Sequence, residues 1–204
     1  MNTLYIGLQT PNADYIHTPL IEIVPVKDDT ALKNAVFNIG DYAYVLFTSR
    51  YAVRFFCQYG LPEGDIRVVS IGPTTTQALQ EIGVRKVTQV ERDDSYGVID
   101  WFCRQPRGRV LIPRSDIALS IIPDGLRQLG FDVTTVTAYR NRMPSDVRRI
   151  DLNRVDRIVF TSPSTVDNFV YVYGSLPQDK ILVTRGRTTQ ERLNQYLKNR
   201  KPTK

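Results

Sequence analysis

The chain has few of the side chains on which metal sites and nucleophilic catalysis depend. Its 204 residues include one histidine, His17, and two cysteines, Cys57 and Cys103, which lie far apart. So few ligands argue against a transition-metal site. They also exclude Ser-His-Asp and Cys-His catalysis unless His17 alone supplies the base. Both cysteines fall in helix-like segments and are expected to be buried thiols in a reducing cytosol.

Several other sequence signals are missing. No apolar run approaches the roughly 18 residues of a membrane span. The first residues, MNTLYIGLQTP, lack a basic region followed by an apolar core, so no signal peptide is expected. Neither the G-x-G-x-x-G dinucleotide fingerprint nor the G-x-x-x-x-G-K-[ST] phosphate loop occurs, which weakens the case for nucleotide binding. We therefore expect a cytoplasmic protein with no membrane partner.

The formal net charge of +6 and the isoelectric point near 9.4 favour an anionic partner. Nucleic acid is one candidate, and a polycarboxylate or phosphate ligand is another. The basic residues are scattered apart from the tail at 199–204, and no nucleic-acid-binding module is recognisable. No nucleic acid partner is therefore expected, and the tail is expected to be a solvated chain end.

The chain contains an internal repeat. The first copy reads VLFTSRYAVRFF at 45–56 and VVSIGPTTTQALQEIG at 68–83; the second reads IVFTSPSTVDNF at 158–169 and ILVTRGRTTQERL at 181–193. The Phe-Thr-Ser elements lie 113 positions apart and the Gly-x-Thr-Thr elements 114. Each part has an apolar run, a turn and an amphipathic run, which predicts strand, loop and helix in two related halves.

Strands that alternate with helices predict a doubly wound α/β fold. The middle of the chain carries five predicted strands, at 43–47, 67–71, 86–90, 109–112 and 131–136. The predicted helices there are 28–39, 50–59, 74–82, 96–103 and 117–129, the last broken or restarted at Pro123. Downstream, the strands 157–160 and 180–184 alternate with the helices 164–173 and 188–199.

The two downstream strands need the N-terminal strand at 3–8 to complete a second sheet. One domain is therefore predicted to be continuous, and the other to be assembled from both chain ends. The predicted parts are a discontinuous domain of 1–17 plus 146–204, a continuous domain of 28–136, and linker strands at 18–27 and 137–145. Both linkers read as extended and can pair side by side.

Candidate site residues follow from this architecture, because ligands of open α/β sheets bind beyond the carboxyl ends of the strands. Helix starts at those ends offer free N–H groups that suit carboxylate or phosphate. The candidates are Thr48, Ser49, Arg50, Gly72, Thr74, Thr75, Pro113, Arg114, Thr161, Ser162, Ser164, Thr188 and Thr189. Arg185 and Arg187 can add charge. The alternative for each Thr or Ser is a simple helix cap, although two copies in one register favour a two-sided cleft.

The order of these elements resembles the uroporphyrinogen-III synthase family. The elements are Pro-Leu-Ile at 19–21, FTSRYAVRFF, IGPTTTQAL, VLIPRSD, TAYRN and FTSPSTVDNF, and they span most of 18–193. No single element is specific, so their order and spacing carry the resemblance. It implies two flavodoxin-like α/β domains joined by a two-stranded linker, with the active site in the cleft between them. It implies no cofactor and no metal.

The resemblance also implies a reaction. Linear hydroxymethylbilane loses its terminal hydroxyl, ring D is inverted through a spiro intermediate, and the macrocycle closes to uroporphyrinogen III with release of water. The expected partner is thus a small polycarboxylate, and the expected oligomeric state is a monomer. Because the same molecule cyclises without inversion in solution, the enzyme must favour one transition state by holding the chain ends in place.

The family places a proton donor for the departing hydroxyl on a tyrosine of the return linker, which here is Tyr139 in TAYRN. A phenol with a pKa of about 10 stays protonated at neutral pH and can donate. The alternative is a linker aromatic that only packs against a domain.

The sequence departs from the family in three places. The helix between the first strand and 15–19 is missing, the second loop reads Gly-Arg-Thr-Thr at 186–189 in place of Gly-Pro-Thr-Thr, and a final strand is expected to be absent. The discontinuous domain is therefore expected to be reduced and less stable. These departures favour a rival hypothesis, a non-catalytic two-lobed protein that binds a small anion. Tyr139 and the intact middle domain favour the synthase.

Overall fold

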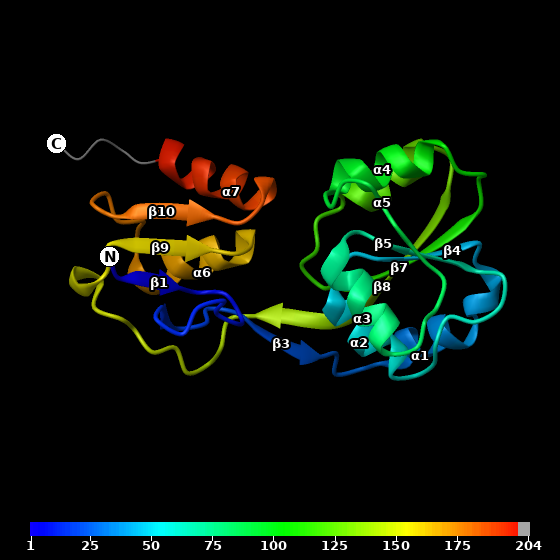
Figure 1. Cartoon of the computed structure of the whole chain (residues 1–204), viewed down its shortest axis with the longest axis horizontal. Helices are drawn as coiled ribbons and strands as arrows, with labels where there is room; N and C mark the ends of the chain where they lie inside the picture. Colours follow the sequence, from blue (N-terminus) through cyan, green and yellow to red (C-terminus); the bar gives the residue numbers. More distant parts are fainter. Residues whose placement is uncertain (200–204) are drawn as a thin grey trace. The chain divides into compact units, whose positions relative to one another are not determined.

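The computed structural model describes residues 1–199 and divides the chain into two α/β units (Figure 1). The continuous unit is Ile23–Asn141, and the end-built unit combines Met1–Glu22 with the chain from Arg142 onwards. Of the basic tail predicted at 199–204, only Asn199 is among the described residues.

The continuous unit is built on a sheet in the order β3-β8-β7-β4-β5-β6. Its strands are β3 (Glu22–Pro25), β4 (Tyr44–Phe47), β5 (Arg67–Ser70), β6 (Val87–Gln89), β7 (Arg109–Ser115) and β8 (Asp132–Arg142). The pairs β4–β5, β5–β6, β4–β7 and β7–β8 are parallel. The strand order reverses between β4 and β7, which is where such sheets bind ligands. Strands β3 and β8, from the two connecting segments, are hydrogen-bonded neighbours.

Helices cover both faces of this sheet. In Figure 1, α1 (Thr30–Phe37), α2 (Arg50–Cys57) and α3 (Pro73–Glu81) lie below it, and α4 (Ser95–Cys103) and α5 (Ile121–Gln128) lie above. A 3-10 turn, η1 (Ile39–Asp41), follows α1. Successive side chains of β4 point to opposite faces of the sheet and so belong to two core clusters. Val45 and Phe47 pack with α1–α3, whereas Tyr44 and Leu46 pack with α4 and α5. The predicted doubly wound α/β fold is thus confirmed.

The segment after β7 differs from the prediction. Pro113 and Arg114 were expected to follow a strand and open a helix, but they lie within β7, and α5 begins only at Ile121. The reason is the long partner strand β8, which stays paired with β7 as far as Ser115 and carries the ladder past the proline. Of the two predicted alternatives, the helix starts afresh close to Pro123 and is not broken there, because Pro123 lies in the first turn, where its missing N–H leaves no bond unmade.

The end-built unit has a parallel sheet in the order β10-β9-β1-β2. Its strands are β1 (Thr3–Tyr5), β2 (Ile16–His17), β9 (Arg157–Phe160) and β10 (Ile181–Thr184), and its helices are η2 (Leu152–Arg154), α6 (Pro163–Tyr173) and α7 (Arg187–Lys198). The two-residue strand β2 was not predicted. It is defined only by its register with β1, which local sequence does not reveal.

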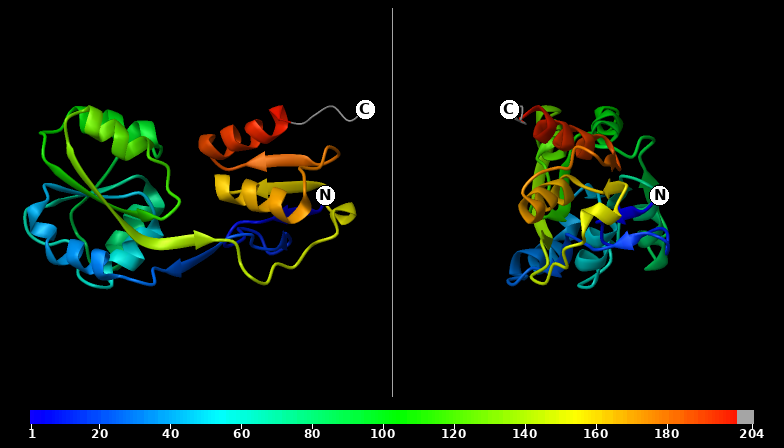
Figure 2. Two further views of the ribbon diagram at one scale, coloured as in Figure 1. Left: turned by 180° about the vertical axis from the view of Figure 1, so that it is seen from behind. Right: turned by 90° about the vertical axis from the view of Figure 1, so that its left-hand side faces the viewer.

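One core cluster holds this unit together. Ile158 and Phe160 of β9 pack with Val166 and Phe169 of α6 and with Leu193 of α7. Both helices therefore cover the same face of the sheet, and α6 lies in front of it in the left view of Figure 2. Within residues 1–199, a loop rather than a helix joins β1 to β2.

That loop, residues 6–15, covers part of the opposite face. Tyr15 stacks on Tyr5 with ring centroids 6.3 Å apart, and His17 Nε2 lies 2.8 Å from the Gly7 carbonyl oxygen. The loop therefore buries the aromatic side chain of β1 in place of a helix. None of the helices in residues 1–199 has the length and apolar character needed to cross a membrane.

Candidate functional site

The carboxyl edge of the six-stranded sheet brings together the predicted site residues of the continuous unit. Thr48 and Ser49 follow β4, Gly72 precedes α3, and Arg114 is near the end of β7. Tyr139 of β8 is in register with Ser115, the last residue of β7. The edge thus holds nine of the predicted residues: Thr48, Ser49, Arg50, Gly72, Thr74, Thr75, Pro113, Arg114 and Tyr139.

A β-bulge sets the direction of Tyr139. The register moves from Arg114 opposite Thr137 to Ser115 opposite Tyr139, so Ala138 is an extra residue in β8. As a result Ala138 and Tyr139, although consecutive, both join the core cluster of α1–α3. Strict alternation would send them to opposite faces, whereas a bulge re-aims a side chain.

The Tyr139 hydroxyl donates a hydrogen bond to Ser49 Oγ at 3.1 Å. Its ring stacks on Phe55 and lies tilted against Tyr51, with both centroid distances at 6.0 Å. The side chain is 7% exposed, and this burial raises the pKa of the phenol above its ordinary value, although the bond to Ser49 acts in the other direction. Tyr139 therefore packs against the unit, as the alternative interpretation expected, and also reaches a predicted site residue as a neutral phenol.

Ser49 joins this tyrosine to the start of α2. It is the N-cap residue, and its Oγ accepts a hydrogen bond from the Tyr51 N–H at 3.0 Å. The hydroxyl oxygen thus accepts from both Tyr51 and Tyr139. A serine hydroxyl has two acceptor positions and one hydrogen, so these two bonds leave its own hydrogen for another partner.

The start of α3 is tightly packed. A Cβ on Gly72 would lie 2.9 Å from the Asp93 Cβ, so glycine is needed for the approach of the loop before α4. Thr74 is exposed, whereas Thr75 is only 2% exposed. The sequence analysis missed Thr76, whose hydroxyl lies 2.6 Å from Ser70 Oγ and 2.7 Å from Gln89 Oε1. Its place in the Thr-Thr-Thr run was the available signal.

The predicted arginines already have partners in the protein. Arg114 donates to the carbonyl oxygens of Ala118 and Leu119, and burial lowers its pKa. The Arg50 guanidinium donates to the Tyr51 hydroxyl at 3.0 Å. In the end-built unit, Arg185 lies 5.5 Å from the Tyr5 ring centroid, and Arg187 pairs with Glu191 at 2.8 Å. An anionic ligand would compete with these contacts.

Asp116 is a further residue of this edge that the sequence analysis missed. Its carboxylate accepts from the Asn141 N–H at 2.9 Å, from Ser115 Oγ at 3.1 Å and from Arg140 Nε at 3.3 Å. Partial burial opposes its ionisation, but these three bonds outweigh that effect and hold the pKa below its ordinary value. The residue ties the chain beyond Tyr139 to β7. The acid at the end of the VLIPRSD element was the signal.

The carboxyl edge of the end-built unit is organised by a capping box at α6. The Ser162 and Thr165 side chains each accept from the other residue's backbone N–H, and Thr165 Oγ1 also accepts from the Thr161 N–H at 3.1 Å. Ser162 Oγ lies 2.9 Å from Ser164 Oγ. The Ser-x-x-Thr spacing could have identified Thr165, which was missed.

At α7 the two predicted threonines differ in exposure. Thr188 is half-buried, whereas Thr189 is 1% exposed and donates from Oγ1 to the Arg185 carbonyl oxygen at 2.9 Å. The Thr189 hydroxyl is therefore already used in a hydrogen bond within the protein. The predicted residues of this edge are Thr161, Ser162, Ser164, Thr188 and Thr189.

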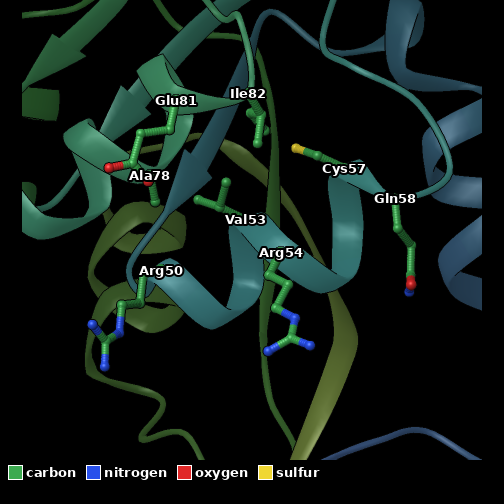
Figure 3. Close-up of a pocket in the computed structure, with 8 residues that line it drawn as sticks. All are labelled: Arg50, Val53, Arg54, Cys57, Gln58, Ala78, Glu81 and Ile82. Carbon is green, nitrogen blue, oxygen red and sulfur yellow. The ribbon is translucent and has the colours of Figure 1, made fainter.

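A separate groove of about 290 Å³ runs between α2 and α3 (Figure 3). Val53, Cys57, Ala78 and Ile82 form its apolar part, and Arg50 connects it to the carboxyl edge. Desolvation raises the pKa of the Cys57 thiol from 9.0 to about 12, so the thiol is neutral at ordinary pH. Among residues 1–199, no group of three or more His, Cys, Asp or Glu side chains is arranged to hold a metal ion.

These features define a two-unit α/β protein with hydroxyl-rich helix starts at the carboxyl edge of each sheet. The family described as uroporphyrinogen-III synthase HemD matches residues 7–200. The chain belongs to the uroporphyrinogen-III synthase family.

Curated relatives agree with this assignment. The chain is 31% identical over 176 residues to the uroporphyrinogen-III synthase of Chlorobaculum parvum, with 77% of this chain and 68% of that protein covered. It is 29% identical to the porphyrin biosynthesis protein HemD of Ruminiclostridium josui, where the match covers 95% of this chain but only 42% of that protein. The names of these relatives place the family in porphyrin biosynthesis.

Solved structures show the same fold at low sequence identity. A mutant uroporphyrinogen III synthase from Thermus thermophilus matches with a TM-score of 0.69 and 16% identity, over 96% of this chain and 88% of that one. The enzyme from Helicobacter pylori matches with a TM-score of 0.62 and 18% identity, over 95% and 88%. These similarities bear on the fold alone.

Proposed function

We propose that this protein is a lyase that closes linear hydroxymethylbilane to uroporphyrinogen III, with inversion of ring D and loss of water, in tetrapyrrole biosynthesis. Family membership over residues 7–200 supports the reaction class. The observation that carries the proposal is the neutral Tyr139 phenol, hydrogen-bonded to Ser49 at the carboxyl edge where the strand order reverses.

Tyr139 is the proposed source of the proton that the departing hydroxyl needs. A hydroxide is a poor leaving group, and protonation lets it leave as water. The raised pKa keeps the phenol protonated at neutral pH, as a general acid requires. Loss of water gives a cationic azafulvene, which ring D then attacks. The proton released on ring closure returns to the phenolate, so the enzyme is regenerated.

The helix starts are the proposed contacts for the substrate carboxylates. In the continuous unit these are the starts of α2 and α3, with Ser49 and Thr74, and in the end-built unit those of α6 and α7, with Ser164 and Thr188. Helix N-termini favour anions through free N–H groups and a partial positive charge. Because Thr75 and Thr189 are buried, we assign them to packing rather than to direct contact with the substrate.

A coupled assay that generates hydroxymethylbilane and separates isomers I and III by chromatography tests the proposal. Wild-type protein should give isomer III. Tyr139→Phe should keep its fold, because ring packing is preserved, and should lower the rate of isomer III formation by about 10²-fold or more. Wild-type turnover in that variant would remove Tyr139 from the mechanism.

Tyr59→Phe is the matched control. Tyr59 lies in the continuous unit, and its hydroxyl also donates to a side-chain acceptor, Asp29 Oδ2 at 2.6 Å, but it is outside the candidate site. Its rate should equal that of the wild type. Thermal melts of both variants would separate loss of chemistry from loss of fold.

A second candidate function is binding of a small anion without catalysis. The small exposure of Tyr139 favours it, because a buried phenol has little surface with which to contact a substrate. This function predicts that the wild-type protein gives isomer I alone, at the uncatalysed rate.

A further inference from the structure

Ser49 is the more exposed partner in the hydrogen bond with Tyr139. The Tyr139 ring is enclosed by core side chains and is 7% exposed, whereas Ser49 is half-buried at the start of α2. The phenolic hydrogen points to Ser49 Oγ, 3.1 Å away. In this arrangement the first acceptor of a proton from Tyr139 is the serine hydroxyl.

The hydrogen bonds of Ser49 leave one position for a substrate atom. Its oxygen accepts from the Tyr51 N–H at 3.0 Å and from Tyr139, which occupies both acceptor positions. The serine hydrogen is therefore the part of the hydroxyl that can bond to a third group. The partial positive charge at the start of α2 stabilises charge that builds up on the oxygen as this hydrogen leaves.

The second copy of the repeat shows that an N-cap serine does not require a tyrosine. Ser162 occupies the position equivalent to Ser49, and its Oγ lies 2.9 Å from Ser164 Oγ. It caps α6 through a capping box with Thr165. The bond from Tyr139 is therefore an addition to the cap of the continuous unit, and the bulge at Ala138 makes it geometrically possible.

We propose that Ser49 is the group that passes the proton to the substrate, and that Tyr139 acts through it as the proton source. This inference rests on the proposed function, in which hydroxymethylbilane loses its terminal hydroxyl. It changes the expected role of Ser49 from an anchor for a carboxylate to a catalytic residue in contact with the leaving oxygen.

The step balances without any further reactant. The Ser49 O–H bond breaks as its proton moves to the leaving hydroxyl, the carbon–oxygen bond of the substrate breaks, and water departs. The Tyr139 proton moves to Ser49 Oγ and restores the serine. A phenolate then accompanies the azafulvene cation. When ring D is attached and its pyrrole loses a proton, that proton returns through Ser49 to Tyr139.

The test is the initial rate of isomer III formation by the full chain carrying Ser49→Ala, Ser49→Gly, Ser49→Thr, Tyr139→Phe, or Ser49→Gly with Tyr139→Phe. The initial rate should fall by about 10²-fold or more in the Ser49→Ala and Ser49→Gly variants, as it should in Tyr139→Phe. The double variant should be no more than about threefold slower than the slower single variant, because a relay in series is already broken by either change. Ser49→Thr should remain within about tenfold of the wild type, since it keeps a hydroxyl.

Two controls separate the relay from the cap. Ser49→Gly removes the hydroxyl but keeps an acceptable N-cap residue, so it tests the relay even if Ser49→Ala fails to fold. Asp94→Ala removes the cap of α4, where Asp94 Oδ1 accepts from the Gly97 N–H at 2.7 Å, in the same unit and outside the relay. It should lower the melting temperature and leave the rate unchanged.

Wild-type rates in Ser49→Gly together with a slow Tyr139→Phe would overturn the relay and leave the proposed function intact. Multiplicative losses in the double variant would also overturn it, because they indicate independent contributions. If the wild-type protein formed no isomer III, the proposed function would fail and the relay with it.

Discussion

The two copies of the repeat share their packing and differ at their helix starts. Phe47 and Phe56 meet edge to face at 5.6 Å and 74°, and their counterparts Phe160 and Phe169 meet at 5.5 Å and 79°. The strand–helix unit has thus kept one core geometry in both places. The caps have diverged, since the Ser49 hydroxyl accepts a hydrogen bond from Tyr139, whereas the hydroxyl of its counterpart Ser162 is hydrogen-bonded to that of Ser164. The two copies therefore agree in the packing of the core and differ in the hydrogen bonds at the carboxyl edge.

The glycine that precedes the second helix of each copy is needed for two different reasons. Gly186 has φ +85° and ψ 156°, a conformation open almost only to glycine. Gly72 is extended, with φ −176°, and is needed because the loop at Asp93 lies against it. The second copy has Arg187 at the position where the first has the proline that follows Gly72. The two copies therefore differ here in backbone conformation and not only in side chain.

The surroundings of the two copies also differ. In the continuous unit, helices cover both faces of the sheet and two core clusters form. In the end-built unit, α6 and α7 share one face and one cluster. In neighbour order β7, β4 and β5 correspond to β1, β9 and β10, whereas β6 has no counterpart in the described sheet. Less burial predicts a lower stability for the end-built unit.

The largest expected effect separates the stabilities of the two units. Phe47→Ala and Phe160→Ala should each cost about 3–5 kcal/mol, because each leaves a cavity beside a fully buried ring. Phe160 lies in the only core cluster described for its unit. Hydrogen exchange by mass spectrometry should therefore show general loss of protection in α6 and α7 for Phe160→Ala, and only partial loss in α2 for Phe47→Ala.

Phe37→Ala is the control for these variants. Phe37 is 88% exposed, so its substitution should lower the free energy of unfolding only slightly. Equal loss of protection in the two units would contradict the expected difference in stability.

The next effect compares the two serine caps. Ser162→Ala should cost about 1 kcal/mol as a lost N-cap. Ser49→Ala should cost about 2–4 kcal/mol, because it also leaves the buried Tyr139 hydroxyl without its acceptor. Urea denaturation followed by circular dichroism measures both. Adding Tyr139→Phe should recover part of the Ser49→Ala loss, and no recovery would argue against the energetic coupling.

The two glycines give a smaller effect with different means of rescue. Gly186→Ala and Gly72→Ala should each cost about 1–3 kcal/mol, the first through backbone strain and the second through a clash. Asp93→Gly removes the Cβ that an alanine at 72 would meet, and should restore most of the stability of Gly72→Ala. The same Asp93→Gly substitution should not restore the stability of Gly186→Ala. Thermal melts of the five variants suffice, and equal rescue of both would refute the distinction.

The smallest effect concerns Cys57, whose counterpart in the second copy is Val170. The pKa of the thiol is about 12 in the folded protein and near 9.0 when unfolded, so only the unfolded state loses its proton at pH 10. Stability therefore falls as pH rises from about 9 to 12, by about 1 kcal/mol at pH 10. Cys57→Val should remove this part of the pH dependence and should match the wild type within about 1 kcal/mol at pH 7. An unchanged alkaline slope would count against the buried thiol.

The sequence was sufficient for the doubly wound fold, because apolar periodicity and the repeat are local signals. It was insufficient for β2 and for the start of α5, which depend on pairing with distant strands. The candidate residues at strand ends were likewise predictable from order alone. The bond between Tyr139 and Ser49 was not, because it joins positions 90 residues apart through the register of β8 on β7.

The bulge at Ala138 gives this family member a vulnerability to insertion that a residue-by-residue comparison would not reveal. A regular ladder would pair Ser115 with Ala138 and turn the phenol to the side of α4 and α5. One residue inserted between Arg114 and Ser115 would pair with Ala138 and make the ladder regular, with the same effect on the phenol. Such a protein would retain every side chain named here and still have the Tyr139 hydroxyl on the opposite side of the sheet from Ser49.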